Sequence, residues 1–358
     1  MAIQSVEWKR YTTPLYEPFR VNYGVHLESE HILLKLTDTN GLTGFGDCTP
    51  LWFFTGETCD SAESLLKMLA KNLKGIDVFD SGALSRLLDS IHGNPSFKSC
   101  LEMAFLDLRA KTLNTQLCTL LGGKFRDSVR VSSGIGMMQE KQAVSAAMKL
   151  VESGIRTFKI KVGESTDREA EKVKSVRRAV GDDVTIRIDA NAAYNPRQAI
   201  RLGRAVSSFA IEYFEQPVKG HDLEGLKEVK KGIDFDVMAD ESVHSSQDAM
   251  RVINFDAADL IGIKLAKCGG IREAKRIIEI TSAVDMPCVI ISAFETWVGI
   301  SANLHLAASS ENCTYANDLA LWTIQKDDLT VGPKHDGDKL FLDSSAGLGA
   351  SADILFSR

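Results

Sequence analysis

Five charged residues follow apolar runs at nearly constant intervals, and this spacing constrains the fold more than any other feature of the chain. They are Lys161, Asp189, Glu215, Asp240 and Lys264, which lie 28, 26, 25 and 24 positions apart. Each interval also contains a helix-like segment. A strand and helix that recur at this period are typical of stacked β-α units. In a (β/α)8 barrel all strands open onto one face at their C-terminal ends, so the five side chains are expected to converge there.

The rest of the chain supplies the other strands and a leading segment of different character. Apolar runs at 129–133, 288–292 and 314–318 add three strand candidates to these five, giving eight. Helices are expected at 58–75, 79–92, 96–113, 139–152, 167–180, 270–284 and 297–309, with another starting at Pro196. Residues 3–47 are predicted to form a β-meander, with loops at 19–24 and 51–56. The fold class is therefore α/β, a (β/α)8 barrel with a smaller N-terminal domain.

A length of 358 residues suffices for one barrel and one smaller domain. We place the boundary after Gly122, so that residues 1–122 form the first domain and residues 123–334 the barrel. The tail, 335–358, contains a short strand candidate at 339–342 and is expected to return to the first domain.

Composition excludes several functional classes. The net charge is −6 and the basic residues are dispersed, which argues against nucleic acid and anionic membranes as partners. No window approaches the 18 apolar residues of a membrane span, and the first ten residues lack the apolar core of a signal peptide. The seven cysteines are scattered without a Cys-x-x-Cys pair, which favours reduced thiols and a cytoplasmic location over a zinc cluster.

Three of the strand-end residues are carboxylates, and together they predict a metal site. Asp189, Glu215 and Asp240 offer anionic oxygens without a neighbouring His or Cys, a donor set that suits Mg²⁺ better than Zn²⁺. Any one of them alone is better explained as a barrel-end acid in a surface ion pair. Three at successive strand ends favour the metal.

The lysines flank this metal site. Lys161 and Lys264 belong to the second and sixth strands, which lie across a barrel from each other. Lys159 shares the face of Lys161, because alternate residues of a strand point the same way. A lysine that removes a proton must be neutral, and a nearby cation such as Lys159 lowers the pKa of its neighbour. The alternative for Lys159-Ile160-Lys161 alone is a solvated strand edge.

These residues lie in motifs that resemble the muconate-cycloisomerase-like subgroup of the enolase superfamily. The motifs are Lys159-Ile160-Lys161, Asp189-Ala190-Asn191, Phe214-Glu215-Gln216-Pro217, Ala239-Asp240-Glu241-Ser242, Ile263-Lys264-Leu265-Ala266-Lys267-Cys268-Gly269-Gly270-Ile271 and Ser292-Ala293-Phe294-Glu295-Thr296. The resemblance covers nearly the whole chain. It implies an α+β capping domain over a modified (β/α)7β TIM barrel.

The resemblance also implies roles for individual residues. One Mg²⁺ would be held by Asp189, Glu215 and Asp240, with Lys161 and Lys264 as acid/base catalysts on opposite faces of the substrate. The loops at 19–24 and 51–56 would close over the substrate. Residues assigned to substrate binding are Tyr23, Trp52, Phe53, Asn191, Glu295 and Asp318. Members of this subgroup are often homo-oligomers.

The implied reaction is proton transfer at a carbon next to a carboxylate, and the motifs look most like those of dipeptide epimerases. Those enzymes carry Asp-x-Asp at the eighth strand, where it holds the substrate's α-ammonium group. This chain has Asp318-Leu319-Ala320, so one carboxylate remains. The alternative for Asp318 is a strand-end cap. Other candidate activities are o-succinylbenzoate synthase, cycloisomerase or another β-elimination, and N-acylamino acid racemase. The remaining alternative is a non-catalytic barrel that only binds an acid or scaffolds other proteins.

Overall fold

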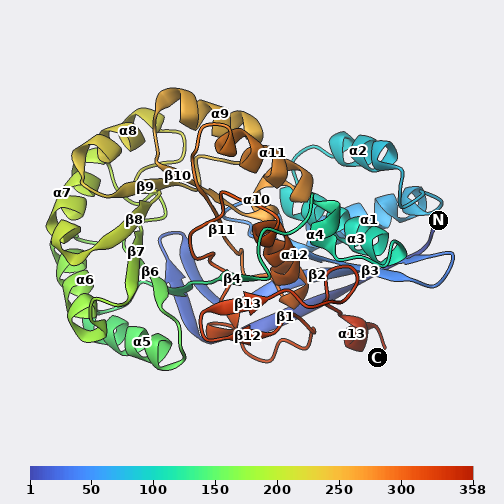
Figure 1. The fold of residues 1–358 in the computed structure, drawn as a ribbon, viewed down its shortest axis with the longest axis horizontal. Coiled ribbons are helices and arrows are strands. Elements are labelled where there is room, and N and C mark those ends of the chain that lie inside the picture. Colours follow the sequence, from blue (N-terminus) through green and yellow to red (C-terminus); the bar gives the residue numbers. More distant parts are fainter. Residues whose placement is uncertain (358) are drawn as a thin grey trace.

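The computed structural model describes residues 1–357, which form an antiparallel N-terminal sheet with helices and a curled parallel sheet with helices outside it (Figure 1). The N-terminal sheet has the order β1-β2-β3, from β1 (Ile3–Val21), β2 (Gly24–Asp38) and β3 (Thr43–Cys48). Its helices are α1 (Cys59–Leu73), α2 (Ser81–Ser90), α3 (Pro95–Thr112) and α4 (Leu117–Leu120). The first three match the predicted helices to within two residues at each end. The helix α3 packs on β3 across a core that includes Phe97, Leu101 and Phe105.

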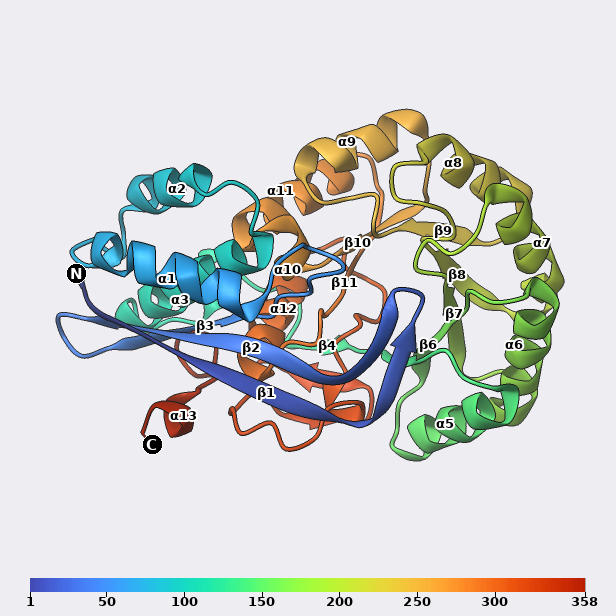
Figure 2. The same ribbon diagram turned by 180° about the vertical axis from the view of Figure 1, so that it is seen from behind.

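The β1–β2 hairpin is longer than the sequence suggested. The expected loop at 19–24 is wrong, because β1 continues to Val21 and β2 resumes at Gly24. The turn is therefore only Asn22 and Tyr23. Phe19 and Val21 are buried against Phe294 and Ile324, and this packing keeps the strand extended. The hairpin tip reaches over the open end of the parallel sheet (Figure 2).

The parallel sheet contains seven hydrogen-bonded strands in the order β11-β10-β9-β8-β7-β6-β5. Its strands are β5 (Ser133–Ile135), β6 (Thr157–Lys161), β7 (Thr185–Asp189), β8 (Ile211–Glu215), β9 (Asp236–Ala239), β10 (Leu260–Ile263) and β11 (Cys288–Ile290). Its helices are α5 (Glu140–Glu152), α6 (Thr166–Val180), α7 (Pro196–Val206), α8 (Leu223–Gly232), α9 (Ser246–Phe255), α10 (Leu265–Cys268), α11 (Ile271–Ser282) and α12 (Trp297–Ala308). Both faces of the sheet are covered, as buried apolar strands require.

The barrel closes through two residues instead of a full eighth strand. Of the predicted strand at 314–318, only Asn317 and Asp318 pair, with Val131 and Ile291 respectively. The Asn317 side chain contributes as well, since its Oδ1 accepts a hydrogen bond from the Ile290 amide at 2.8 Å. The first predicted strand is also displaced. Residues 128–130 form β4, which lies outside the parallel sheet, and the barrel strand begins at Ser133.

The strand register brings the predicted site residues to one level. Lys161 is opposite Asp189, and Asp189 is opposite Glu215, each as the last residue of its strand. Asp240 and Lys264 come immediately after β9 and β10. The convergence expected from the spacing is confirmed.

The tail contacts both parts of the chain. The short strands β12 (His335–Asp336) and β13 (Lys339–Phe341) form a sheet with β4 (Ser128–Arg130). Farther on, Leu348 donates its amide to Asp107 of α3, and α13 (Asp353–Phe356) lies beside β2 through an ion pair between Asp353 and Lys35. Within residues 1–357, no helix has the length and apolar character needed to cross a bilayer.

Gly46 lets β3 lie directly against α3, and its substitution tests that packing. A Cβ at this position would be 2.0 Å from the carbonyl oxygen of Cys100. The backbone of a buried helix moves at a cost, so we expect Gly46→Ala to lower the free energy of unfolding by about 1–3 kcal/mol. The measurement is the midpoint of guanidinium denaturation at unchanged slope.

Gly82→Ala is the matched control, because its Cβ would meet only the side-chain ends of Arg86 and Asp80, at 3.2 and 3.3 Å. We expect an unchanged or higher midpoint there, since alanine favours helix more than glycine does. Equal midpoints for the two variants would contradict the close packing of β3 on α3.

Candidate active site

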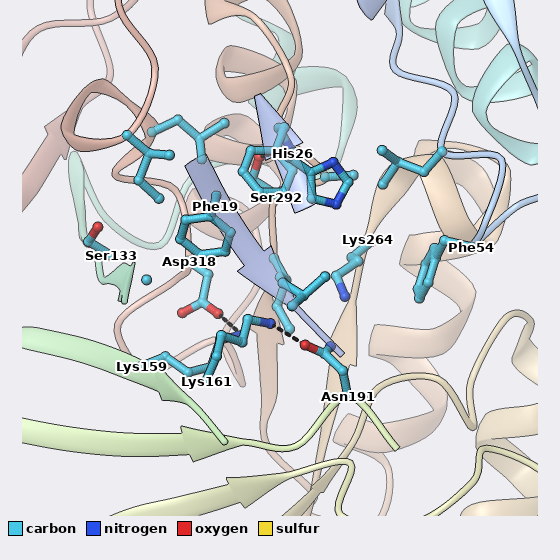
Figure 3. A pocket seen from close by; sticks show the side chains of 18 of the residues that line it. Phe19, His26, Phe54, Ser133, Lys159, Lys161, Asn191, Lys264, Ser292 and Asp318 are labelled. Atoms are coloured by element: carbon cyan, nitrogen blue, oxygen red, sulfur yellow. Dashed lines mark hydrogen bonds and ion pairs between the residues drawn. The ribbon is translucent and has the colours of Figure 1, made fainter. Parts of the chain in front are cut away.

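A cavity opens at the C-terminal end of the parallel strands, beneath the β1–β2 hairpin (Figure 3). Polar side chains line its floor: Ser132, Ser133, Lys159, Lys161, Asn191, Lys264, Ser292 and Asp318. The hairpin and the segments after β3, β11 and Asp318 supply apolar walls: Phe19, Val21, Leu51, Phe53, Phe54, Phe294, Leu321 and Ile324. A polar floor under an aromatic roof can hold a charged group of a small molecule and enclose its apolar remainder.

The three strand-end carboxylates lie below this floor, without any exposed surface. Asp189 Oδ2 accepts a hydrogen bond from Lys161 Nζ at 2.5 Å. Glu215 Oε2 accepts one from Lys159 Nζ at 2.6 Å. Asp240 binds the ammonium groups of Lys264 and Lys267, the latter at 2.6 Å. Each of these three buried carboxylates thus has a lysine partner, as the cost of burying an isolated charge demands.

Lys161 and Lys264 approach the cavity from strands separated by three others, β7, β8 and β9. Beside its bond to Asp189, Lys161 Nζ donates to Asn191 Oδ1 at 2.8 Å. Lys264 Nζ lies 4.8 Å from the ring centroid of Phe54, a cation–π distance. Two amines therefore face one cavity from different sides, and the carboxylate-bearing strands lie between them.

The carboxylates fit a hard divalent cation by their chemistry. Burial and the neighbouring charges of Asp189 and Asp240 raise the pKa of Glu215 well above its usual range, although Lys159 opposes this. Its Oε1 atom is buried without a hydrogen-bond partner. Within residues 1–357, no three acidic, histidine or cysteine side chains are already grouped around one point, and lysine ammonium groups lie between these acids. Mutual repulsion and an unused oxygen are what a cation placed among them would relieve.

Lys159 is part of this charge network and is not a solvated strand edge. Its side chain is 6% exposed, and its Nζ lies 2.6 Å from Asp318 Oδ2 and 3.4 Å from Asp189 Oδ2. Lys161 approaches the same Asp189 oxygen, so the two ammonium groups are neighbours, as the shared strand face predicts. Burial disfavours the charged form of Lys159, but Asp318, Glu215 and Asp189 outweigh it and hold its pKa above the usual range.

Asp318 is bonded to three protein side chains. Besides Lys159, it contacts the hydroxyl of Ser132 and the guanidinium of Arg187, whose Nη1 lies 3.2 Å from Oδ1. Burial opposes ionisation of Asp318, but Lys159 and then Arg187 hold its pKa below the usual value. Ala320, at the second position of the Asp-x-Asp pattern, also lines the cavity. The floor therefore carries one carboxylate, and that carboxylate is already paired with two cations.

The structure brings most, but not all, of the predicted substrate-binding residues to the cavity. Tyr23, Phe53, Asn191 and Asp318 line it. Trp52 does not, because its side chain is 71% exposed and meets Phe53 edge-on from outside. Glu295 is buried behind the wall, where Oε2 accepts hydrogen bonds from the Ala293 amide and the Ser292 hydroxyl. Glu295 therefore stabilises the wall segment and does not line the cavity.

Four residues of the site were not singled out from the sequence. Lys267 donates to Asp240, and its signal was the spacing of three from Lys264 on the following helix. Arg187 precedes Asp189 by two residues and so shares its strand face. Glu241 is adjacent to Asp240 and accepts from Tyr23, and burial together with Asp240 raises its pKa to about 7. His26, which stacks on Phe294 at 5.3 Å, had no signal in the sequence.

Comparison with known proteins agrees with this geometry. Residues 5–122 match the mandelate racemase/muconate lactonizing enzyme N-terminal domain, and residues 142–354 match the enolase C-terminal domain-like family. A hydrophobic dipeptide epimerase of Enterococcus faecalis is 33% identical over 98% of this chain and 100% of its own length. An L-Ala-D/L-Glu epimerase of Bacillus subtilis is 32% identical over 98% of this chain and 96% of its own.

The same relation holds in three dimensions. The crystal structure of the dipeptide epimerase from E. faecalis, complexed with Mg and the dipeptide L-Leu-L-Tyr, aligns with a TM-score of 0.94 at 33% identity. The alignment covers 98% of this chain and all of that one. Matches to both parts of the fold, along nearly its whole length, leave one assignment: this chain belongs to the mandelate racemase/muconate lactonizing enzyme family of the enolase superfamily.

Proposed function

We propose that this protein is a Mg²⁺-dependent epimerase that inverts the α-carbon of a dipeptide or a similar amino-acid derivative. The observation that carries the proposal is the placement of Lys161 and Lys264 in one cavity, on strands with three others between them. Inversion needs one group to remove a proton from one face and another to return it to the opposite face. The whole-chain similarity to dipeptide epimerases supports the same reaction.

Each lysine has a defined task in this proposal. A neutral Lys161 removes the α-proton, and the ammonium form of Lys264 delivers a proton from the other side. The reverse reaction exchanges their roles. Asn191 holds Lys161 and Asp240 holds Lys264 through the contacts described above. Lys159 binds the same Asp189 oxygen as Lys161 does and is its neighbouring cation. The apolar roof of Phe19, Phe53 and Phe294 excludes water from the reacting carbon.

Asp189, Glu215 and Asp240 are the residues that would hold Mg²⁺. When bound, the ion supplies positive charge that offsets the charge gained by a substrate carboxylate during proton removal. The unpartnered Glu215 Oε1 and the mutual repulsion of the acids support this assignment.

The cavity walls favour apolar substituents on the substrate. Leu321, Ile324 and Phe294 line the same cavity as Asp318, and Ala320 adds no charge to it. A substrate ammonium group would share Asp318 with Lys159 and Arg187, so it would be held weakly. Hydrophobic dipeptides therefore fit the cavity better than strongly charged ones.

The proposal extends to the setting of the enzyme. All seven cysteines are free and buried thiols, which suits a reducing compartment, and we place the reaction in the cytoplasm. Residues 1–122 with the tail act as the capping domain, and 123–334 as the catalytic barrel. Homo-oligomerisation remains a prediction that light scattering would decide.

Substitution of the lysines tests the reaction. We expect Lys161→Ala and Lys264→Ala each to lower epimerisation by about 10²- to 10⁴-fold, the usual contribution of a positioned acid or base. The measurement is ¹H NMR of hydrophobic dipeptides with Mg²⁺ in D₂O. Each variant should still exchange the α-proton of the one epimer that faces its remaining lysine.

Two results would refute the epimerase. The first is that both variants keep full activity. The second is that a substrate loses water or undergoes ring opening, without proton exchange at an α-carbon that keeps its bonds. The second would identify an elimination or cycloisomerisation on the same scaffold. Lys174→Ala is the control and should leave activity unchanged, because Lys174 is a half-buried lysine of α6 paired with Glu171 and does not line the cavity.

Removal of the metal tests the carboxylate site. Dialysis against EDTA should abolish epimerisation, and added Mg²⁺ should restore it. Glu215→Gln should weaken Mg²⁺ binding by at least about tenfold in titration calorimetry, because a neutral amide replaces a charged oxygen ligand. Full activity after exhaustive chelation would contradict the assignment.

Ala320→Asp tests the recognition of the ammonium group. We expect a several-fold lower KM for free dipeptides but not for their N-acetyl derivatives, because a second carboxylate pairs only with the ammonium form. Ala320→Asn, of equal size and no charge, is the control. Equal changes for both substrate classes would show that the ammonium group lies elsewhere.

A further inference from the structure

The turn of the N-terminal hairpin is hydrogen-bonded to the loop that follows β7 and carries Asn191. Asn22 Nδ2 donates to the main-chain oxygen of Asn191 at 3.0 Å. The hydroxyl of Tyr23 donates to Glu241 Oε1 at 2.7 Å, and the same oxygen accepts from Asn191 Nδ2 at 3.1 Å. Both residues of the turn are thus connected to Asn191. Asn22 bonds to it directly, and Tyr23 is linked to it through Glu241.

Asn191 is in turn bonded to Lys161. Its Oδ1 accepts from Lys161 Nζ at 2.8 Å, as Figure 3 shows. The Asn191 backbone has a φ of +42°, in the left-handed region, and its main-chain N–H donates to Asp189 Oδ1 at 2.7 Å. The side chain is therefore fixed at both ends, and the strained backbone is sustained by its surroundings.

The contact with Glu241 fixes the orientation of the Asn191 side-chain amide. Because Glu241 Oε1 is an acceptor, Asn191 must present its NH₂ group there, and its oxygen is then left for Lys161. The opposite orientation would set oxygen against oxygen and NH₂ against an amine. An N–H of Lys161 committed to Asn191 Oδ1 limits the directions open to its lone pair.

We propose that Tyr23 and Glu241 are positioning residues that orient Lys161 through Asn191, so that the contact of the hairpin turn with this loop sets the aim of one of the two catalytic lysines. This inference rests on the proposed epimerase and makes its two catalytic lysines unequal, because only Lys161 depends on the hairpin. Lys264 has different partners, Asp240 and the ring of Phe54. Tyr23 then serves through its hydroxyl, in addition to the contact of its ring with Phe53 at 5.9 Å.

The test is Tyr23→Phe, which removes the hydroxyl and keeps the ring. The Lys161→Ala and Lys264→Ala variants first identify which epimer depends on which lysine for α-proton exchange in D₂O. Tyr23→Phe should then slow exchange of the Lys161-dependent epimer by about 3- to 10-fold, the effect of one lost hydrogen bond. Exchange of the Lys264-dependent epimer and the KM should stay at wild-type values.

Equal losses for both epimers, or no loss for either, would overturn the positioning role. A change in KM alone would also overturn it, and would make Tyr23 a specificity residue. Tyr16→Phe is the control, since Tyr16 is an exposed tyrosine of the same strand at 62% exposure. It should leave both exchange rates unchanged.

A second measurement does not depend on activity. Brief acetylation with acetic anhydride, followed by mass spectrometry, gives a reaction rate for each lysine. In Tyr23→Phe the rate at Lys161 should rise relative to that at Lys264, because Lys161 is less restrained, and an unchanged ratio would refute the proposal. If the wild-type protein exchanges no α-proton, the epimerase fails, while this ratio still decides whether the hairpin positions Lys161.

Discussion

The pairing of buried charges at the strand ends is the interaction on which this site depends. Asp189, Glu215 and Asp240 have no exposed surface, and a carboxylate in such a position needs a cation or a metal. The lysines that supply the cations come from the flanking elements, with Lys159 and Lys161 on β6 and Lys264 and Lys267 after β10. Because these charges offset one another on adjacent strands, the end of the barrel can be polar while the sheet below it is apolar.

The N-terminal hairpin completes what the barrel begins. The barrel provides the charged floor, but Phe19, Val21 and Tyr23 of the hairpin form part of the roof and the connection to Asn191. A long antiparallel hairpin suits this task because its tip can extend far from its own sheet while its backbone remains hydrogen-bonded. Chemistry and enclosure are thus divided between the two parts of the chain, which the tail joins through contacts to both.

The charged residues in and below the floor of the site were largely predictable, and the walls were only partly so. Lys159, Lys161, Asp189, Glu215, Asp240 and Lys264 follow from strand periodicity and regular spacing, since both fix side-chain direction. Trp52 and Glu295 lie in irregular segments, where no period relates sequence to direction, and neither lines the cavity. Arg187 and Lys267 had the required spacing, but their importance depends on which acids lie opposite.

The sequence by itself determined the α/β class, the order of strands and helices, and the convergence of acids and lysines at one end of a barrel. These depend on local periodicity and on the geometry common to parallel strands. The tertiary structure decided that the hairpin is extended to a two-residue turn, that only Asn317 and Asp318 close the barrel, and that Asp318 is paired with Lys159 and Arg187. Each of these results from contacts between residues distant in sequence, whose burial and hydrogen bonding outweigh local preference.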